Sequence, residues 1–169
     1  MTKPHDRYWA EVYDRQRAGG TRPLVDNPTA DEVIAELQRW DPQDVLEVGC
    51  GWGRLLEPVN KVFDAAGCDY SRFMLDRIPA PLRYRTFQWD ITQPFKGTNV
   101  WSVAYTRGVM VYMQRYGDLG KALANLLTVT ERKLIFWEWP ETLEAIVREL
   151  PEGAEHMVLL RPIEHRTKE

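Results

Sequence analysis

The stretch from residue 45 to residue 56 constrains the fold of this chain more than any other part of the sequence. It opens with Val45-Leu46-Glu47-Val48, a short apolar run that predicts a buried strand, and its last residues start a helix. Between the two, glycine occupies every second position: Gly49, Gly51 and Gly53. Glycine lets the chain turn sharply and leaves the main chain bare, so a flat ligand can lie against it. The stretch therefore predicts an open α/β sheet that binds a ligand at the carboxyl ends of its strands.

The spacing of these glycines separates two classes of ligand. The dinucleotide fingerprint G-x-G-x-x-G directs a helix N-terminus at a pyrophosphate. This chain instead places Glu47 two residues before the first glycine, where a carboxylate would repel a pyrophosphate but attract an ammonium or sulfonium group. The spacing therefore argues against a nicotinamide-dependent reductase and for a positively charged ligand. An ordinary glycine-rich turn without a ligand is the alternative.

Length and composition place the chain among ordinary globular proteins. Its 169 residues suit one domain, and 44% hydrophobic with 28% charged residues is an average balance. The net charge is -3 with no basic stripe, which argues against a large phosphate-binding surface but leaves a small nucleic-acid substrate open. No apolar run reaches membrane-span length and the first residues lack a signal-peptide core, so we expect a cytoplasmic protein without membrane association. Cys50 and Cys68 belong to no metal-binding pattern, so we expect no metal.

Two further predicted strands also end in an acidic residue. A strand over residues 62–68 leads to Asp69, about as far from the glycine loop as the acidic residue that binds ribose hydroxyls in nucleotide-binding folds. An ionised carboxylate only accepts hydrogen bonds, which suits two vicinal hydroxyl groups. A strand over residues 82–89 leads to Asp90, which could instead cap the turn that begins at Thr92.

The glycine loop, the segment 67–75 and the acidic strand ends closely resemble the class I S-adenosylmethionine-dependent methyltransferases. The resemblance covers about residues 29–150 and implies a three-layer, Rossmann-like α/β fold. We expect a mostly parallel sheet of about six strands, shortened from the family's seven, with helices on both faces. It also implies the cofactor S-adenosyl-L-methionine, whose sulfonium and ammonium groups are the kind of positive charge that the carboxylate before the loop favours.

The resemblance assigns roles to individual residues. Glu47 and the loop would hold the methionine part of the cofactor, Asp69 the ribose, Asp90 the adenine amino group and Ile91 the adenine ring. The implied cofactor-binding set is Glu47, Gly49, Cys50, Gly51, Gly53, Asp69, Tyr70, Asp90, Ile91 and Thr106.

The resemblance leaves the chemistry at the methyl group open. The fourth strand, over residues 100–105, leads to Thr106-Arg107-Gly108-Val109 where DNA amino-methyltransferases carry Asp/Asn-Pro-Pro-Tyr/Phe, so base methylation of that type is not expected. The candidate catalytic residues are Arg107, Tyr112 and Glu138. Arg107 could hold an anionic group or lie on the surface. Tyr112 could accept a proton or form a pocket wall, and Glu138 could deprotonate a substrate or simply meet solvent.

The rest of the chain predicts one domain over residues 1–169. Residues 1–28 hold a short helix that either closes over the cofactor as a lid or packs its aromatic residues on the sheet. Residues 29–150 form the cofactor-binding core, and residues 151–169 form a final strand and tail. Further helices are expected from Thr29 or Asp31 to residue 40, over 52–60, over 114–130 and over 142–150, and further strands over 44–48, 133–139 and 156–161.

The sequence thus favours a methyltransferase that acts on an oxygen, nitrogen or sulfur atom of a small-molecule substrate, as a monomer or homodimer. A methyltransferase for RNA or protein, and a non-catalytic binding or scaffold subunit, remain the alternatives. If the acceptor needs a base, His5 and His156 are further candidates, and neither belongs to a motif.

Replacing Asp69 by alanine tests the ribose assignment. Asp69→Ala would remove two hydrogen bonds to the cofactor and weaken its binding by roughly 2–4 kcal/mol. Calorimetric titration with S-adenosylmethionine measures the loss, and an unchanged affinity would contradict the assignment.

Overall fold

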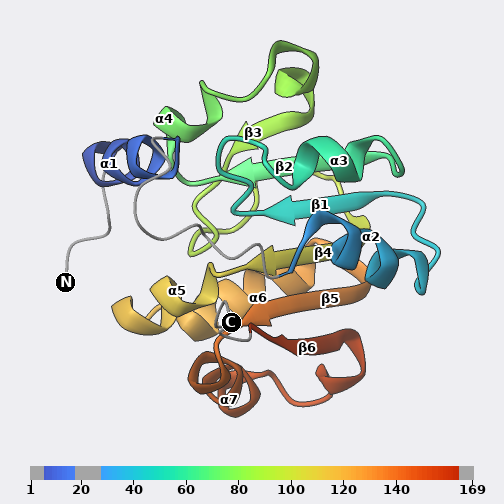
Figure 1. Ribbon diagram of the computed structural model, residues 1–169. Coiled ribbons are helices and arrows are strands. Elements are labelled where there is room, and N and C mark those ends of the chain that lie inside the picture. Colours follow the sequence, from blue (N-terminus) through green and yellow to red (C-terminus); the bar gives the residue numbers. More distant parts are fainter. Residues whose placement is uncertain (1–5, 18–27, 164–169) are drawn as a thin grey trace, which may run out of the picture.

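Six parallel strands in the order β3-β2-β1-β4-β5-β6 build the centre of the chain, as seen in a computed structural model (Figure 1). The structure describes residues 6–17 and 28–163. The strands are β1 Val45–Val48, β2 Ala65–Asp69, β3 Thr86–Gln88, β4 Trp101–Arg107, β5 Thr130–Glu138 and β6 Val158–Pro162. The helices are α1 Asp6–Arg17, α2 Ala30–Gln38, α3 Leu56–Asn60, α4 Arg72–Leu75, α5 Met110–Tyr116, α6 Leu119–Thr128 and α7 Pro140–Glu149, with 3-10 turns η1 Ala80–Arg85 and η2 Glu155–Met157.

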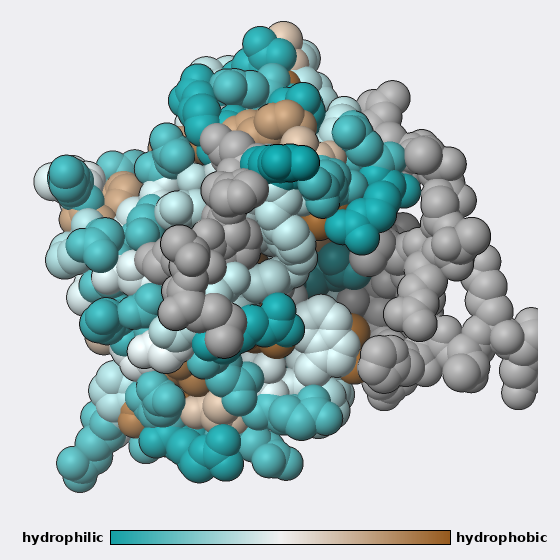
Figure 2. Space-filling model, turned by 90° about the vertical axis from the view of Figure 1, so that its left-hand side faces the viewer, coloured by the Kyte–Doolittle hydropathy of each residue, from teal (hydrophilic) through white to brown (hydrophobic). Residues whose placement is uncertain are grey.

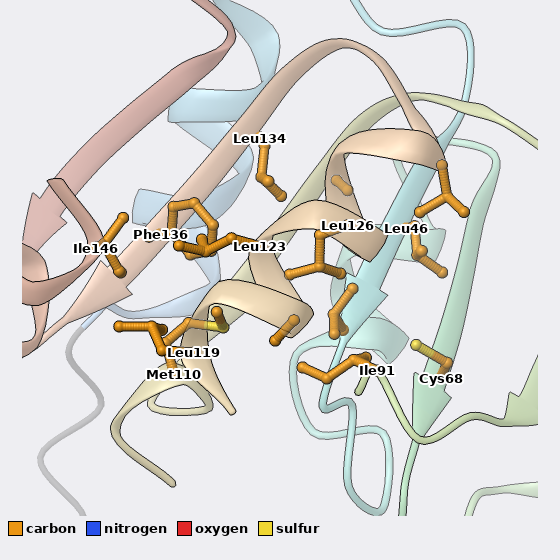
Figure 3. Packing of buried hydrophobic residues seen from close by; sticks show 14 of the residues in the cluster. Leu46, Cys68, Ile91, Met110, Leu119, Leu123, Leu126, Leu134, Phe136 and Ile146 are labelled. Atoms are coloured by element: carbon orange, nitrogen blue, oxygen red, sulfur yellow. The ribbon is translucent and has the colours of Figure 1, made fainter. Parts of the chain in front are cut away.

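Helices cover both faces of the sheet, which confirms the predicted three-layer α/β fold. On one face, residues of α5, α6 and α7 pack on Leu46, Leu134 and Phe136 (Figure 3). On the other face, α2, α3 and α4 pack on Val45 and Val103. All four residues of β1 are buried, as expected for a central strand of a parallel sheet.

The helix that precedes β1 begins where the sequence predicted. Thr29 Oγ1 accepts a hydrogen bond from the Glu32 backbone N–H at 3.2 Å, and Glu32 Oε2 accepts one from the Thr29 N–H at 2.7 Å. This capping box satisfies two backbone donors at the start of α2. Val33 and Leu37 of α2 are fully buried against the sheet.

Several predicted element boundaries differ from the structure. The helix expected over 52–60 begins at residue 56, because Gly51 and Gly53 have positive φ and the chain is still turning. The helix expected over 114–130 is two helices, since Gly117 adopts φ 74 and ends α5. The strand expected over 82–89 is reduced to 86–88, because Pro81 lies in the first turn of η1. The strand expected over 62–68 starts at 65 after a turn.

The end of the sheet supports the predicted count of six strands. β6 pairs in parallel with β5, from Leu134 opposite Val158 to Glu138 opposite Pro162. This order leaves β3 and β6 at the two edges of the sheet. None of the helices within residues 6–17 and 28–163 has the length and apolar character needed to cross a membrane.

The strand order fixes where a ligand can bind. The chain moves outward from β1 to β2 and β3, then crosses back to β4 on the other side of β1. Loops that leave β1 and β4 therefore run in opposite directions and open a crevice at the carboxyl ends of these strands.

Candidate functional site

A cavity of about 360 Å³ lies at the carboxyl ends of the central strands. Figure 2 looks onto this side of the molecule, where the described surface around the site is mostly hydrophilic. The lining includes the three predicted acidic residues together with the predicted glycine loop residues 49–51, Tyr70, Ile91, Arg107 and Tyr112. Three predicted site residues, Gly53, Thr106 and Glu138, are not part of the lining.

The glycine loop is held against the end of β2. The backbone N–H groups of Gly49 and Cys50 both donate to the Cys68 carbonyl oxygen, at 2.8 and 3.0 Å. Gly49 adopts φ 77, and a Cβ at this position would lie 2.3 Å from Val109 Cγ2. Only glycine therefore lets the end of β1 pass under the turn between β4 and α5.

The side-chain carboxylate of Asp69 binds the backbone of the same loop. Its Oδ2 accepts a hydrogen bond from the Gly51 N–H and its Oδ1 one from the Ser71 N–H, each at 2.8 Å. Ser71 in turn caps α4 by accepting from the Met74 N–H at 3.3 Å. The half-buried carboxylate thus lines the cavity and also shapes its floor.

Asp90 makes the turn contact that the sequence left open as an alternative. Its Oδ1 accepts from the Thr92 N–H at 3.0 Å and from the Thr92 hydroxyl at 2.8 Å. Asp90 and the buried Ile91 nevertheless both line the cavity. The ends of β1, β2 and β3 thus bring Glu47, Asp69 and Asp90 to one place.

Glu47 is the most deeply placed acid of the cavity, with 4% of its surface exposed. Burial raises its pKa from 4.5 to about 8, the Tyr105 hydroxyl beside it lowers that pKa, Asp69 raises it and Arg107 lowers it. Within the described part of the chain, Glu47 Oε2 has no hydrogen-bond partner. The cavity therefore offers a buried acceptor atom that a donor group of a ligand can satisfy.

Arg54 is a cavity residue that the sequence analysis missed. It follows the last glycine of the loop and lines the cavity together with Arg107 at the end of β4. Burial and the charge of Arg107 lower the Arg54 pKa to about 10. The sequence did hold a signal for this role, because Arg54 comes directly after the glycine loop and the loop borders the cavity.

Glu138 is fully buried, so the expectation of a carboxylate that meets solvent is wrong. Its Oε1 accepts hydrogen bonds from the Val109 and Met110 backbone N–H groups, both at 2.7 Å. Burial raises its pKa from 4.5 to about 7, while backbone donors at the start of α5 and Arg107 lower it. Glu138 thus anchors α5 from behind the cavity wall.

α1 contributes a third side of the cavity. Tyr8, Trp9 and Val12 line it, and the Trp9 and Tyr112 rings lie edge to face at 5.5 Å. At the other end of the helix, the Tyr13 ring lies 5.9 Å from Trp52 of the glycine loop. α1 therefore bridges the α5 side and the loop side of the cavity.

Of the two histidines considered as a base, His156 does not line the cavity. His156 is exposed in η2, just before the amino end of β6 and thus at the opposite edge of the sheet. His5 lies outside the described residues.

Glu138 should make the protein less stable as the pH rises. Between about pH 4.5 and pH 7 the native state keeps a proton on Glu138 that the unfolded chain releases. The free energy of unfolding is therefore highest below this range and falls across it, by on the order of 3 kcal/mol. Glu138→Gln keeps an oxygen that accepts from Val109 and Met110 but cannot ionise. We expect wild-type stability near pH 5 and higher stability than the wild type near pH 8, measured by urea denaturation.

The matched control is Glu141→Gln, which changes an exposed carboxyl in the first turn of α7. It should reproduce the wild-type dependence of stability on pH. Parallel pH profiles for the wild type and Glu138→Gln would contradict the role assigned to Glu138.

Comparison with known proteins bears on the fold. No protein-family model matches the sequence, and the search of curated proteins found no match. Among solved structures, the chain is similar to the magnesium protoporphyrin IX methyltransferase of Synechocystis PCC 6803 with bound S-adenosylmethionine, with a TM-score of 0.65 and 16% identity over 86% of this chain and 82% of that one. It is also similar to the N-methyltransferase NodS of Bradyrhizobium japonicum WM9 in complex with S-adenosyl-L-homocysteine, with a TM-score of 0.59 and 18% identity over 84% of each chain.

A third similar structure is an S-adenosylmethionine-dependent methyltransferase of Clostridium acetobutylicum ATCC 824, with a TM-score of 0.58 and 20% identity over 75% of this chain and 53% of that one. The chain spans only 53% to 61% of the length of this methyltransferase and of three other similar structures. With its strand order, its glycine loop and these neighbours, the chain has the α/β fold of the class I S-adenosylmethionine-dependent methyltransferases.

Proposed function

We propose that this chain is an S-adenosylmethionine-dependent methyltransferase that modifies an oxygen, nitrogen or sulfur atom of a small molecule. One observation carries the proposal: Glu47, Asp69 and Asp90, from three adjacent strand ends, line a single cavity above a loop that glycine keeps bare. Similar structures that hold S-adenosylmethionine or its demethylated product support the choice of cofactor.

The residues present suit the parts of this cofactor. Glu47 offers its buried Oε2 to the ammonium group of the methionine part. Asp69 lines the cavity, and an ionised carboxylate only accepts hydrogen bonds, which suits ribose hydroxyls. Asp90 and the apolar Ile91 stand where a base with an amino group would fit.

S-adenosylmethionine brings an already activated methyl group, so the protein has to supply binding and orientation. Orientation of two reactants can lower a barrier by several kcal/mol, on the order of 7 or more in favourable cases. Arg107 and Tyr112 line the cavity near the end of β4 and are placed to orient an acceptor. Burial and the Tyr8 hydroxyl raise the pKa of Tyr112, so it serves as a hydrogen-bond donor rather than as a base near neutral pH.

Turnover separates this function from that of a binding subunit. The purified chain is incubated with S-adenosylmethionine labelled in the methyl group and with a pool of small metabolites. Transfer of label to a small molecule supports the proposal. Tight cofactor binding without transfer would identify a non-catalytic subunit. Transfer of label to added RNA or protein would show that the substrate is a macromolecule and not a small molecule.

Cofactor binding should release a proton from Glu47. Near pH 7 the buried carboxyl is mostly protonated, because its pKa is about 8 without ligand. An ammonium or sulfonium group beside it favours the carboxylate, so the affinity should rise by up to about tenfold per pH unit between pH 6 and pH 8. Calorimetry in phosphate and in Tris, whose ionisation enthalpies differ, should then give different binding enthalpies at the same pH.

Glu47→Gln should abolish the difference between the buffers and weaken binding. The exposed Glu57 of α3 provides the control, and Glu57→Gln should behave as the wild type. Equal binding enthalpies in both buffers for the wild type would show that Glu47 does not meet the positive charge of the ligand.

A further inference from the structure

The cavity has two ends that differ in composition. The ends of β1, β2 and β3 contribute Glu47, Asp69 and Asp90, which the proposed function assigns to the cofactor. The other end is lined from α1, the turn after β4, α5 and the residue before α7, and we call it the aromatic end. The aromatic rings that the structure describes there are Tyr8, Trp9, Tyr112, Tyr116 and Trp139.

These rings stand around a shared space. Trp9 meets Tyr8 edge to face at 5.0 Å and Tyr112 edge to face at 5.5 Å. The Trp139 ring lies over Gly108, where an added Cβ would be 3.4 Å from it, so this ring stands directly after the carboxyl end of β4. Each of the five aromatic residues is only half-buried, and each lines the cavity. Their contacts with one another therefore leave ring surface for a ligand.

The aromatic end holds no carboxylate and no cation among its described residues. Its lining beside the rings consists of Val12, Gly108, Val109 and Met113. Burial and the Tyr8 hydroxyl raise the pKa of Tyr112, so this phenol keeps its proton at neutral pH. Arg107 borders this end as the last residue of β4, and the carboxyls of Glu47 and Glu138 interact with its charge.

A wall of this composition selects a ligand by shape and polarity. Burying a charge without an opposite partner costs free energy, so the aromatic end favours an uncharged group. Aromatic rings attract other aromatic rings in offset-stacked or edge-to-face arrangements, beyond the gain from burying apolar area. The cavity volume of about 360 Å³ is at the low end for ligand pockets, so a ligand that shares it with the cofactor has to be small or extend out of it.

On the basis of the proposed function, we infer that the methyl acceptor is an uncharged, flat aromatic compound, whose ring packs against Trp9, Tyr112 and Trp139. Its oxygen, nitrogen or sulfur atom faces the cofactor. A lone pair of this atom forms a bond to the methyl carbon while the carbon–sulfur bond breaks and its electron pair stays on sulfur. The proton of the acceptor is released to water. The Tyr8 and Tyr112 hydroxyls, 3.5 Å apart, supply the polar contacts at this end.

A flat probe and its saturated counterpart test the inference on the full chain. The probes are 2-naphthol and decahydro-2-naphthol, which share a carbon skeleton and a single hydroxyl group. Calorimetric titration at pH 7 with saturating S-adenosyl-L-homocysteine measures the affinity for each. The saturated compound is at least as apolar, so transfer from water alone does not favour the flat one. We expect 2-naphthol to bind about tenfold more tightly, because only a flat ring gains the aromatic contacts.

Charged analogues test whether the acceptor is uncharged. 2-Naphthoate and 2-naphthylmethylammonium keep the flat ring and carry a negative and a positive charge. Each should bind about tenfold more weakly than 2-naphthol, because neither charge finds an opposite partner at the aromatic end. If either binds as tightly as 2-naphthol or more tightly, the inference is wrong.

Variants on two elements assign the preference to the rings. Trp9→Leu in α1 and Trp139→Leu before α7 each keep an apolar side chain and lose a ring. Each should reduce the preference for 2-naphthol over its saturated counterpart to about threefold or less, with the affinity for S-adenosyl-L-homocysteine unchanged. Trp40→Leu is the matched control, because Trp40 is also half-buried, donates from Nε1 to Glu36 and lies outside the cavity lining.

Two kinds of failure are distinguishable. If the wild type binds S-adenosyl-L-homocysteine but binds the flat and the saturated probe equally, the inference about the acceptor is wrong and the proposed function stands. The same holds if the preference persists unchanged in both Trp9→Leu and Trp139→Leu. If the wild type does not bind S-adenosyl-L-homocysteine at all, the proposed function itself is wrong. The comparison of probes on the wild type decides the inference even where a variant does not fold.

Discussion

The attachment of the glycine loop to its neighbours is the constraint on which the rest of the site depends. From one side, the Cys68 carbonyl oxygen and the Asp69 carboxylate hold the backbone N–H groups of Gly49, Cys50 and Gly51. From the other side, Val109 lies so close to Gly49 that no side chain fits there. Any ligand that lies on this loop therefore meets a surface fixed from both β2 and the β4–α5 turn.

Glu138 extends this constraint to the wall of the cavity. By accepting hydrogen bonds from Val109 and Met110, it fixes both the residue that presses on Gly49 and the start of α5. The same helix carries Tyr112 and Tyr116 into the cavity. One buried carboxyl thus links the floor of the site to its aromatic side, although it does not itself line the cavity. The cost is a carboxyl whose ionisation opposes folding, which is tolerable because the protonated form keeps an acceptor oxygen.

Charge is divided between two sides of the cavity. Acidic strand ends stand at β1, β2 and β3, and guanidinium groups stand at the switch between β1 and β4. A cofactor that carries a sulfonium, an ammonium and a carboxylate suits such a division, because it has charges of both signs. α1 then covers the space between, through Trp9 on the α5 side and Tyr13 on the loop side.

Much of the fold could be predicted because its signals are local. The apolar run 45–48, the glycine spacing, the helix start near Thr29 and the acidic strand ends each depend on residues close in sequence, and the structure retains them. The differences were also local: Pro81 shortened β3 and Gly117 separated α5 from α6, and each is a single residue within a longer apolar pattern.

By itself, therefore, the sequence determined the class of the fold, the order of its core elements and the edge of the sheet where acidic residues gather. Only the tertiary structure decided that Glu138 is buried beneath α5, that Arg54 and Arg107 line the same cavity, and that α1 contributes residues to its lining. The physical reason is that burial and the proximity of charges depend on which strands become neighbours. Segments far apart along the chain create those environments, and no spacing within one segment records them.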